Sequence, residues 1–271
     1  MTNHRLQALL KPSSIAILGA SQKTGSVGNE VIKNLLRGGF EGEIFGVNPG
    51  YVEVEGILCY PSLAQLPKCP QHVIFAINDH RIEAALDEVV SIGIPACTIF
   101  SALIISDDST PNLKQRIATK AQNAGLLVAG ANGMGFYNVR DRVLAGGFDT
   151  RDHPYPGNVT LISQSGAGMS GIVDCERRIQ FNFAVSSGYE LTVSMEDYLD
   201  YALDLPETRV VGLFLETSRH PEKLIKAFKK ANQRGIPIVV LKVGRTDLAA
   251  ELAISHSGAL AGSDRCYQAV F

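Results

Sequence analysis

The feature that most constrains this chain is a repeated alternation of short apolar runs with longer amphipathic segments. The apolar runs are rich in Val, Ile and Phe, and the segments between them show helical periodicity. Continuous apolar strands separated by helices are typical of a parallel sheet that is covered on both faces. In the first half we expect strands at 14–18, 43–47, 72–77, 96–100 and 126–130, and helices at 27–37, 82–90 and 113–123.

The alternation breaks between Gly146 and Asn158, a stretch that contains Pro154 and Pro156 and has little periodicity. We interpret this stretch as a domain boundary and predict two α/β domains, over residues 1–150 and 151–271. Because the chain ends inside the last predicted helix, we expect the second domain to be truncated at its C-terminal end. In this domain we expect strands at 158–163, 183–186, 210–215 and 237–242, helices at 168–178, 193–204 and 221–234, and a last helix from about 258.

Composition excludes several classes of protein. Hydrophobic residues make up 45% and charged residues 19% of the chain, so it can bury hydrophobic cores and is not disordered. A formal net charge of −2 argues against a general nucleic-acid partner. No apolar run approaches the ~18–20 residues of a membrane span, and the N-terminus lacks the apolar stretch of a secretory signal. The five cysteines are scattered without a C-x-x-C pair, so we expect a cytoplasmic protein without disulfides, a metal site or a membrane partner.

A glycine-rich segment joins the first predicted strand to the first predicted helix. Glycines let the backbone approach a phosphate, and a helix N-terminus offers unpaired N–H groups and a positive dipole end. The spacing differs from the G-x-G-x-x-G fingerprint of NAD-binding proteins, and no Walker A lysine follows. A glycine-rich turn that binds no ligand is the alternative interpretation. The candidate contacts in this segment are Gly19, Ala20, Ser21, Gly25, Val27 and Gly28.

The end of the second predicted strand bears on the kind of nucleotide. The strand ends in Val47-Asn48-Pro49, where NAD-binding enzymes usually carry an acid that holds the ribose diol. A neutral Asn48 suits a ribose that bears a phosphate, because an acid would repel that phosphate. Coenzyme A carries such a 3′-phosphate, so we add Asn48 and Pro49 to the candidate cofactor contacts.

A second helix start follows the strand at 158–163. The run Ser163-Gln164-Ser165-Gly166 places hydroxyls and small residues where a helix begins, which is the composition of an anion cup. It differs from the G-x-S-x-G nucleophile elbow, because Ser163 stands in place of the first glycine. Ser165 and Gly166 are the candidate phosphate contacts, and a plain serine N-cap is the alternative.

His256 lies among small residues in the run Ser255-His256-Ser257-Gly258. An imidazole at a helix start can carry a phosphate that the helix dipole stabilises, with Ser257 and Gly258 as further phosphate contacts. Its other ring nitrogen needs an acceptor, and Glu216, at the end of a predicted strand, is the candidate. A solvated loop carboxylate is the alternative for Glu216. We interpret the remaining histidines as solvated or capping side chains, namely His4, His72, His80, His153 and His220.

In combination, these motifs resemble the NDP-forming acyl-CoA synthetases, which include the ADP-forming acetate–CoA ligases and, more distantly, the α subunit of succinyl-CoA synthetase. The resemblance runs in order from about Ser14 to Phe271. The residues that carry it are Ile17-Leu18-Gly19-Ala20-Ser21, Gly25-Ser26-Val27-Gly28, Val47-Asn48-Pro49, Leu161-Ile162-Ser163-Gln164-Ser165-Gly166 and Ser255 to Asp264.

The resemblance implies a Rossmann-like CoA-binding domain followed by a flavodoxin-like parallel-sheet ligase domain. It implies the reaction acid + CoA + ATP ⇌ acyl-CoA + ADP + phosphate, through an acyl phosphate and a phosphorylated His256 whose imidazole Glu216 holds. Ser165 and Gly166 would line the phosphate site, and the candidate cofactor residues would contact CoA. ATP/ADP and Mg would be bound by an ATP-grasp domain or subunit that has no counterpart in these residues, and the assembly would be an oligomer.

Three stretches depart from the family pattern, and we expect them near the acyl pocket or the pantetheine path. They argue against acetate as the sole substrate and leave room for a larger acid. They are Ser101-Ala102-Leu103-Ile104, Gly130-Ala131-Asn132-Gly133-Met134-Gly135 and Ser187-Gly188-Tyr189-Glu190.

Three other functions stay open. A CoA-binding regulatory module would keep the fold without the ligase chemistry, although the presence of both His256 and Glu216 argues against it. An NAD(P)-dependent oxidoreductase is disfavoured by Asn48. An acyl-CoA-linked lyase or transferase on the same scaffold would use the same residues.

Overall fold

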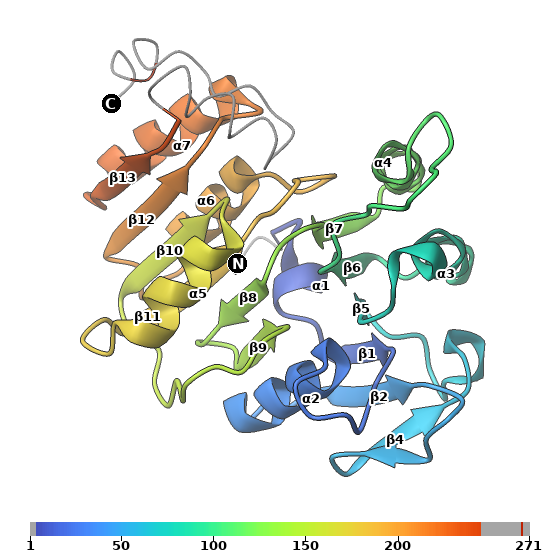
Figure 1. Cartoon of the computed structure of the whole chain (residues 1–271). Coiled ribbons are helices and arrows are strands. Elements are labelled where there is room, and N and C mark those ends of the chain that lie inside the picture. The colour runs from blue at the N-terminus through green and yellow to red at the C-terminus, as the bar shows by residue number, and fades with distance from the viewer. Residues whose placement is uncertain (1–3, 245–266, 268–271) are drawn as a thin grey trace.

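The computed structural model describes residues 4–244 and Tyr267, and it contains two sheets with helices packed on their faces (Figure 1). The first sheet has the strand order β3-β4-β2-β1-β5-β6-β7. Its strand pairs are parallel except the short β3–β4 pair. Its strands are β1 (Ser14–Leu18), β2 (Glu43–Val47), β3 (Glu53–Val54), β4 (Ile57–Tyr60), β5 (His72–Phe75), β6 (Ala96–Ile99) and β7 (Leu127–Gly130).

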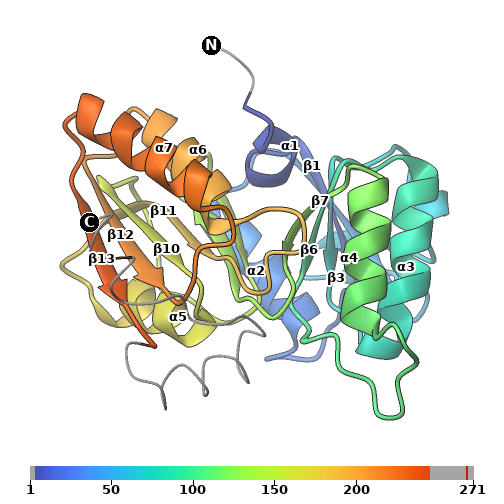
Figure 2. The same ribbon diagram turned by 90° about the horizontal axis from the view of Figure 1, so that it is seen from above.

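The helices of the first domain divide between the two faces of this sheet. Helices α3 and α4 lie side by side on the outer face, and α1 and α2 lie on the face toward the second sheet (Figure 2). Each of α2 and α3 ends in a glycine in the left-handed conformation, which terminates a helix without strain. The helices are α1 (Gln7–Leu10), α2 (Val27–Gly38), α3 (Asp79–Ile92) and α4 (Leu113–Asn123), and a 3-10 turn spans Leu63–Gln65.

The second sheet has the order β13-β12-β10-β11-β8-β9. Helix α5 covers one face, and α6 and α7 cover the other (Figure 2). The strands are β8 (Gly135–Asn138), β9 (Val143–Gly146), β10 (Val159–Ser163), β11 (Phe181–Ser186), β12 (Val210–Leu215) and β13 (Ile238–Lys242), and the helices are α5 (Gly166–Cys175), α6 (Met195–Asp204) and α7 (Pro221–Gln233). The predicted α/β class with two parallel-dominated sheets is therefore confirmed.

Strands β8 and β9 were not predicted. They form an antiparallel hairpin, and β8 pairs antiparallel with β11 in a sheet that we expected to be parallel throughout. The two strands are four residues each and are fully buried, so neither shows the alternation by which a half-exposed strand is recognised. Sheet membership therefore changes after β7, earlier in the chain than the predicted division at residue 150.

A second correction concerns α5, which we expected at 168–178. The helix begins at Gly166, because the Ser165 hydroxyl accepts the Gly168 N–H and caps the first turn. Glycines at 166 and 168 lower helix propensity, and the cap outweighs that preference.

Two histidines that we interpreted as solvated or capping are buried instead. The Nε2 of His72, on β5 in the middle of the first sheet, lies 2.9 Å from the Thr98 hydroxyl. Burial lowers the pKa of His72 to about 3. Burial also lowers the pKa of His153 to about 4, and the charge of Arg151 adds to the effect. Both imidazoles are therefore neutral members of the interior near pH 7.

The two domains share one hydrophobic cluster. It joins Leu9 of α1 and Leu35 of α2 with Phe183 of β11 and Leu199 of α6. Polar contacts reinforce the junction, since the Nδ2 of Asn34 on α2 donates to the carbonyl oxygens of Gly146 and Phe148, over 3.0 and 2.7 Å. Within residues 4–244 and at Tyr267, no helix is long and apolar enough to cross a membrane.

Candidate functional site

The loop between β10 and α5 is a tight turn of hydroxyl and small residues. The Ser163 hydroxyl donates to the Ser165 carbonyl oxygen over 2.6 Å, and the Gly168 N–H donates to the Ser165 hydroxyl over 3.2 Å. A Cβ at Gly166 would lie 2.7 Å from the Cγ of Met134, so a larger residue would displace that side chain. The first backbone N–H groups of α5 lie beside Ser165 and Gly166, which is the geometry that an anion cup requires.

Glu216 directly follows β12 and is 6% exposed. The side chain of Gln164 holds this position, because its Oε1 accepts the backbone N–H groups of Glu216 and Thr217 over 2.7 and 2.9 Å. The Gln164 Nε2 also donates to the Thr217 carbonyl oxygen over 2.7 Å. Strands β10 and β12 are parallel neighbours, so the cup and the carboxylate lie at the carboxyl ends of adjacent strands, where ligand sites form in open α/β sheets.

Gln164 also contacts Glu190, a buried carboxylate in the loop after β11. The Glu190 Oε1 accepts from the Gln164 Nε2 over 2.9 Å and from the Ser187 hydroxyl over 2.7 Å. Arg219 places its Nε 3.2 Å from the Oε2 of Glu190. Burial raises the pKa of Glu190 to about 7, and the charge of Glu196 raises it further, against the opposing effect of these hydrogen bonds and of Arg219.

The three stretches that depart from the family pattern meet where the domains join. The Asn132 N–H donates to the Ser101 carbonyl oxygen over 2.8 Å, and the Tyr189 N–H donates to the Ala131 carbonyl oxygen over 2.7 Å. A Cβ at Gly188 would lie 2.1 Å from the same Ala131 oxygen, so this close approach requires glycine. The departures therefore form one continuous region beside the cup.

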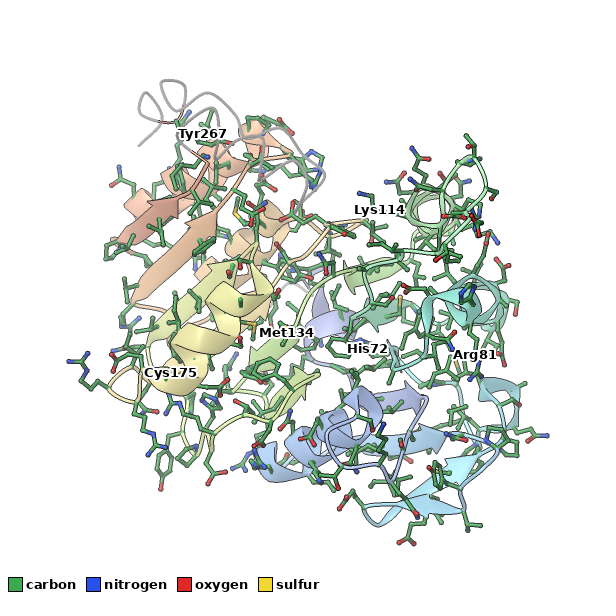
Figure 3. The ribbon with its side chains drawn as sticks, in the orientation of Figure 1. His72, Arg81, Lys114, Met134, Cys175 and Tyr267 are labelled. Carbon is green, nitrogen blue, oxygen red and sulfur yellow. The ribbon has the colours of Figure 1, made fainter. Side chains whose placement is uncertain are left out.

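Charged, aromatic and thioether side chains meet at this region. The ammonium group of Lys114, at the start of α4, lies 4.4 Å from the centre of the Tyr189 ring, a distance suited to a cation–π contact. Met134 lies between α5 and the first domain (Figure 3). The junction thus offers an aromatic ring and a thioether next to the predicted phosphate site.

The first glycine-rich turn is closely packed. Gly19 has a φ of +98°, and a Cβ there would lie 2.3 Å from the Ala76 carbonyl oxygen, while a Cβ at Gly28 would lie 2.1 Å from the Gly19 carbonyl oxygen. The Asn48 Nδ2 donates to the Ala20 carbonyl oxygen over 2.8 Å, and its Oδ1 accepts the Gly50 N–H over 2.9 Å. Asn48 thus links the ends of β1 and β2, and Ala20 is fully buried.

The remaining cofactor candidates surround the start of α2. Val27 is its first residue, Ser21 is half-buried, and Gly25 and Pro49 are exposed. The buried carboxylate of Glu30 accepts the Gly25 N–H over 3.0 Å and closes the loop onto the helix. The structure therefore brings the candidates for CoA together at the carboxyl ends of β1 and β2 and the start of α2.

Sequence analysis did not identify Gln164, Glu190, Arg219 or Glu30 as site residues. The available signal for Gln164 was its position between two serines at a helix start. Glu190 was named only as the end of a stretch that departs from the family pattern, and Arg219 was not named. The burial and pairing of both residues result from long-range packing.

Other predicted residues fall outside the described part of the chain, namely His256, Ser257 and Gly258. In residues 4–244, together with Tyr267, no group of three or more His, Cys, Asp or Glu residues could hold a metal ion.

Comparisons with known proteins agree with this architecture. Residues 13–138 match the family described as CoA binding domain, and residues 156–271 match the succinyl-CoA ligase like flavodoxin domain. The chain is 31% identical over 271 residues to the ADP-forming acetate–CoA ligase of Methanocaldococcus jannaschii, with 99% of this chain and 38% of that protein covered. It is 30% identical to the α subunit of the ADP-forming acetate–CoA ligase I of Pyrococcus furiosus, with 98% of this chain and 58% of that subunit covered.

A solved structure shares the whole arrangement. It is the dinucleotide-forming acetyl-coenzyme A synthetase 1 of Candidatus Korarchaeum cryptofilum, in complex with phosphate and ADP, with a TM-score of 0.88 and 28% identity. It covers 98% of this chain, and this chain covers 57% of it. The chain thus spans about two fifths to three fifths of the length of these relatives. The two domain matches occur in the predicted order, so the chain carries a CoA-binding domain followed by a succinyl-CoA-ligase-like domain, and over both domains it is similar to the ADP-forming acyl-CoA synthetases.

Proposed function

We propose that this chain is the CoA-binding and phosphohistidine portion of an ADP-forming acyl-CoA synthetase. The reaction is acid + CoA + ATP ⇌ acyl-CoA + ADP + phosphate, and it runs through an acyl phosphate and phospho-His256. The observation that carries the proposal is the side chain of Gln164, which joins the Glu216 loop to the cup at Ser165. A buried carboxylate and a helix N-terminus held together in this way suit an imidazole that exchanges a phosphoryl group.

In the first domain, the turn at Gly19 and the start of α2 are the proposed site for the nucleotide part of CoA. The close packing of Gly28 against Gly19 brings the N-terminus of α2 next to the end of β1, where a phosphate can accept backbone N–H groups. The Asn48 amide supports the turn through Ala20 and adds no negative charge that would repel a ribose phosphate.

In the second domain, each proposed step conserves atoms and charge. In the direction of acyl-CoA cleavage, a phosphate oxygen attacks the thioester carbonyl carbon, the C–S bond breaks to give the acyl phosphate, and CoA leaves as the thiolate that then takes a proton. An imidazole nitrogen of His256 next attacks the phosphorus of the acyl phosphate, and the carboxylate of the acid leaves. The Glu216 carboxylate accepts the N–H of the other ring nitrogen and stabilises the charge that develops on the imidazole. The N–H groups of α5 beside Ser165 bind the phosphoryl oxygens.

Transfer of the phosphoryl group to ADP requires an ATP-grasp domain or subunit, which would also bind Mg. The α-subunit name of one relative and the partial coverage of every compared relative support this division of labour. The aromatic and thioether side chains at the junction, Tyr189 and Met134, support an acid larger than acetate.

Transfer of label from inorganic phosphate tests the proposal. The protein, with its ATP-grasp module, is incubated with ³²P-phosphate and one of acetyl-CoA, butyryl-CoA or phenylacetyl-CoA, without nucleotide. We expect label that is stable in alkali and labile in acid, as a phosphoramidate is, and we expect none in His256→Ala. Absence of label with all three thioesters, or equal labelling of His256→Ala, would overturn the proposal.

Calorimetry tests the first domain separately. We expect CoA to bind, dephospho-CoA to bind more weakly, and NAD not to bind. Binding of NAD without CoA would exclude the ligase and point to an oxidoreductase.

A further inference from the structure

We infer that Gln164 is a positioning residue that holds Glu216 in the orientation the phosphohistidine requires, an inference that rests on the proposed function. It does not touch the reacting atoms in this assignment. It acts through the backbone of the loop that carries the carboxylate.

Every donor and acceptor site of the Gln164 side-chain amide has a partner in the protein. A carboxamide has two acceptor sites on its oxygen and two N–H donors. The Gln164 oxygen accepts from the N–H groups of Glu216 and Thr217, and the nitrogen donates to the Thr217 carbonyl oxygen and to Glu190. All four sites are used within 2.7 to 2.9 Å, so one orientation of the amide satisfies every partner.

The side-chain amide of Gln164 lies at the carboxyl end of β12, where pairing with neighbouring strands ends. Within β12, backbone groups pair with neighbouring strands up to Leu215. The next two N–H groups, of Glu216 and Thr217, pair with the Gln164 side chain in place of another strand. Gln164 itself is anchored to β12, since its backbone N–H donates to the Phe214 carbonyl oxygen over 3.1 Å. The side chain therefore determines the direction in which the chain leaves the sheet with Glu216.

Glu190 fixes which end of the amide faces the Glu216 loop. Its Oε1 accepts from both Gln164 and Ser187, and an ionised carboxylate can only accept. A flipped amide would place its oxygen against this carboxylate oxygen and its nitrogen against two backbone donors. Arg219 pairs with the other carboxylate oxygen, which keeps Glu190 in place. Gln164 thus lies between the pair of buried Glu190 with half-buried Arg219 and the proposed catalytic carboxylate.

Two substitutions at one position separate positioning from simple packing. Gln164→Met keeps the length of the side chain and removes all four hydrogen bonds. Gln164→Glu keeps an acceptor for the Glu216 and Thr217 N–H groups but places a second carboxylate against Glu190. Both variants are tested in the labelling reaction with the thioester that labels the unmodified protein best.

We expect Gln164→Met to slow labelling about 10–100-fold at unchanged KM for the thioester, by analogy with the loss of the residues that orient metal ligands. We expect Gln164→Glu to be similarly slow at pH 8 and to recover as the pH falls to 5.5, relative to the unmodified protein. A proton taken up by this pair of carboxyl groups, of which Glu190 already has a pKa of about 7, restores a donor between them and removes the repulsion. A purely structural role would not produce that recovery.

Asn182→Leu is the matched control. Asn182 is also a buried amide of the second sheet, on β11, and its Nδ2 donates to the Thr208 hydroxyl over 2.7 Å while its Oδ1 accepts from Thr160. It lies at the opposite end of the strands from Gln164. We expect it to destabilise the fold without slowing labelling beyond 2-fold in the folded protein.

The outcomes distinguish this inference from the proposed function. If the unmodified protein is labelled at His256 and folded Gln164→Met is labelled at the same rate, the positioning role is wrong and the proposed function stands. If Gln164→Glu shows no recovery at low pH, or Asn182→Leu slows labelling as much as Gln164→Met, positioning is likewise rejected. If the unmodified protein takes no label, the proposed function fails and this inference fails with it.

Discussion

At the scale of single residues, the site depends on polar atoms that are buried and paired by partners distant in sequence. Glu190 is the clearest case, because its side chain has no exposed surface and its charge is balanced by Arg219 and two hydrogen-bond donors. Its raised pKa shows that burial outweighs these partners. Such a carboxylate makes the stability of the fold depend on pH.

We expect Glu190→Gln to change the pH dependence of unfolding. The pKa of Glu190 is about 7 in the fold against an ordinary value of 4.5, so the folded protein binds more protons than the unfolded chain between these values. This contribution to stability is complete below pH 4.5 and is lost as the pH rises through 7, by up to about 3 kcal/mol.

Urea unfolding of both proteins from pH 4.5 to 8 measures this effect as a difference in free energy. His72 and His153, whose pKa values are lowered, contribute the opposite slope in both proteins and cancel in that difference. If the free energies of unfolding of the unmodified protein and of Glu190→Gln differ by the same amount at every pH, the assignment to Glu190 is contradicted.

Gly19 and Gly25 form a matched pair in the proposed CoA site. Both have positive φ, +98° and +78°, but a Cβ at Gly19 would lie 2.3 Å from the Ala76 oxygen and a Cβ at Gly25 would meet nothing within 4 Å. We expect Gly25→Ala to cost about 1 kcal/mol for the left-handed backbone alone. Gly19→Ala should cost about 1–3 kcal/mol more through the clash and weaken CoA binding at least 10-fold. Thermal unfolding and calorimetry check the pair, and equal losses would show that the close contact does not matter.

At the scale of secondary-structure elements, helix starts carry the proposed anion sites. Helix α5 begins with glycines and depends on its cap, whereas α6 begins with a capping box between Ser194 and Asp197. The start of α5 is therefore the weaker of the two, and its cap is also a predicted phosphate contact.

We expect Ser165→Ala to destabilise the protein by about 1 kcal/mol, the usual effect of losing a serine cap, and to slow phosphate labelling of the protein. Ser170→Ala, at a half-buried position later in the same helix, is the control and should change neither quantity appreciably. Chemical denaturation and the labelling assay measure both. A labelling rate that is unchanged in Ser165→Ala would leave Ser165 as a structural cap only.

At the scale of the whole molecule, the two domains are joined by packing rather than by a linker alone. Helix α2 lies between the two sheets, and the Cβ of an alanine at Gly38 would lie 2.8 Å from the Cγ of Leu144 on β9. The shared hydrophobic cluster and the Asn34 hydrogen bonds complete the junction. We infer that the predicted CoA site and the predicted phosphate site are held at a constant separation by this contact.

We expect Asn34→Leu to weaken that junction. The substitution leaves the buried carbonyl oxygen of Gly146 and the half-buried one of Phe148 without this donor, at a cost of about 2–4 kcal/mol. We also expect the single unfolding transition to broaden or split as the domains separate. Differential scanning calorimetry detects the change, and Asn182→Leu, which alters only the second domain, should lower the transition temperature and keep one transition. A single sharp transition in Asn34→Leu would contradict the proposed coupling.

The alternation of strands and helices was predictable because it depends on local hydrophobic periodicity. Strands β1 and β2 match the predicted residues, and β10 and β12 match within one residue. The glycine-rich turn at Gly19 and the helix start after Ser26 were predictable for the same reason, since turns and caps have local residue preferences. The start of α5 was predicted two residues too late, because its two glycines mask the cap at Ser165.

The sequence by itself thus determined the α/β class, the order of the elements and the positions of the candidate motifs, because each is encoded within a few neighbouring residues. Only the tertiary structure decided what those motifs contact. The β8–β9 hairpin pairs with β11, Gln164 completes its hydrogen bonds with a loop 52 and 53 residues away, and Glu190 meets Arg219 inside the protein. Such pairings depend on burial and on the meeting of strand ends in three dimensions, and no local residue preference specifies them.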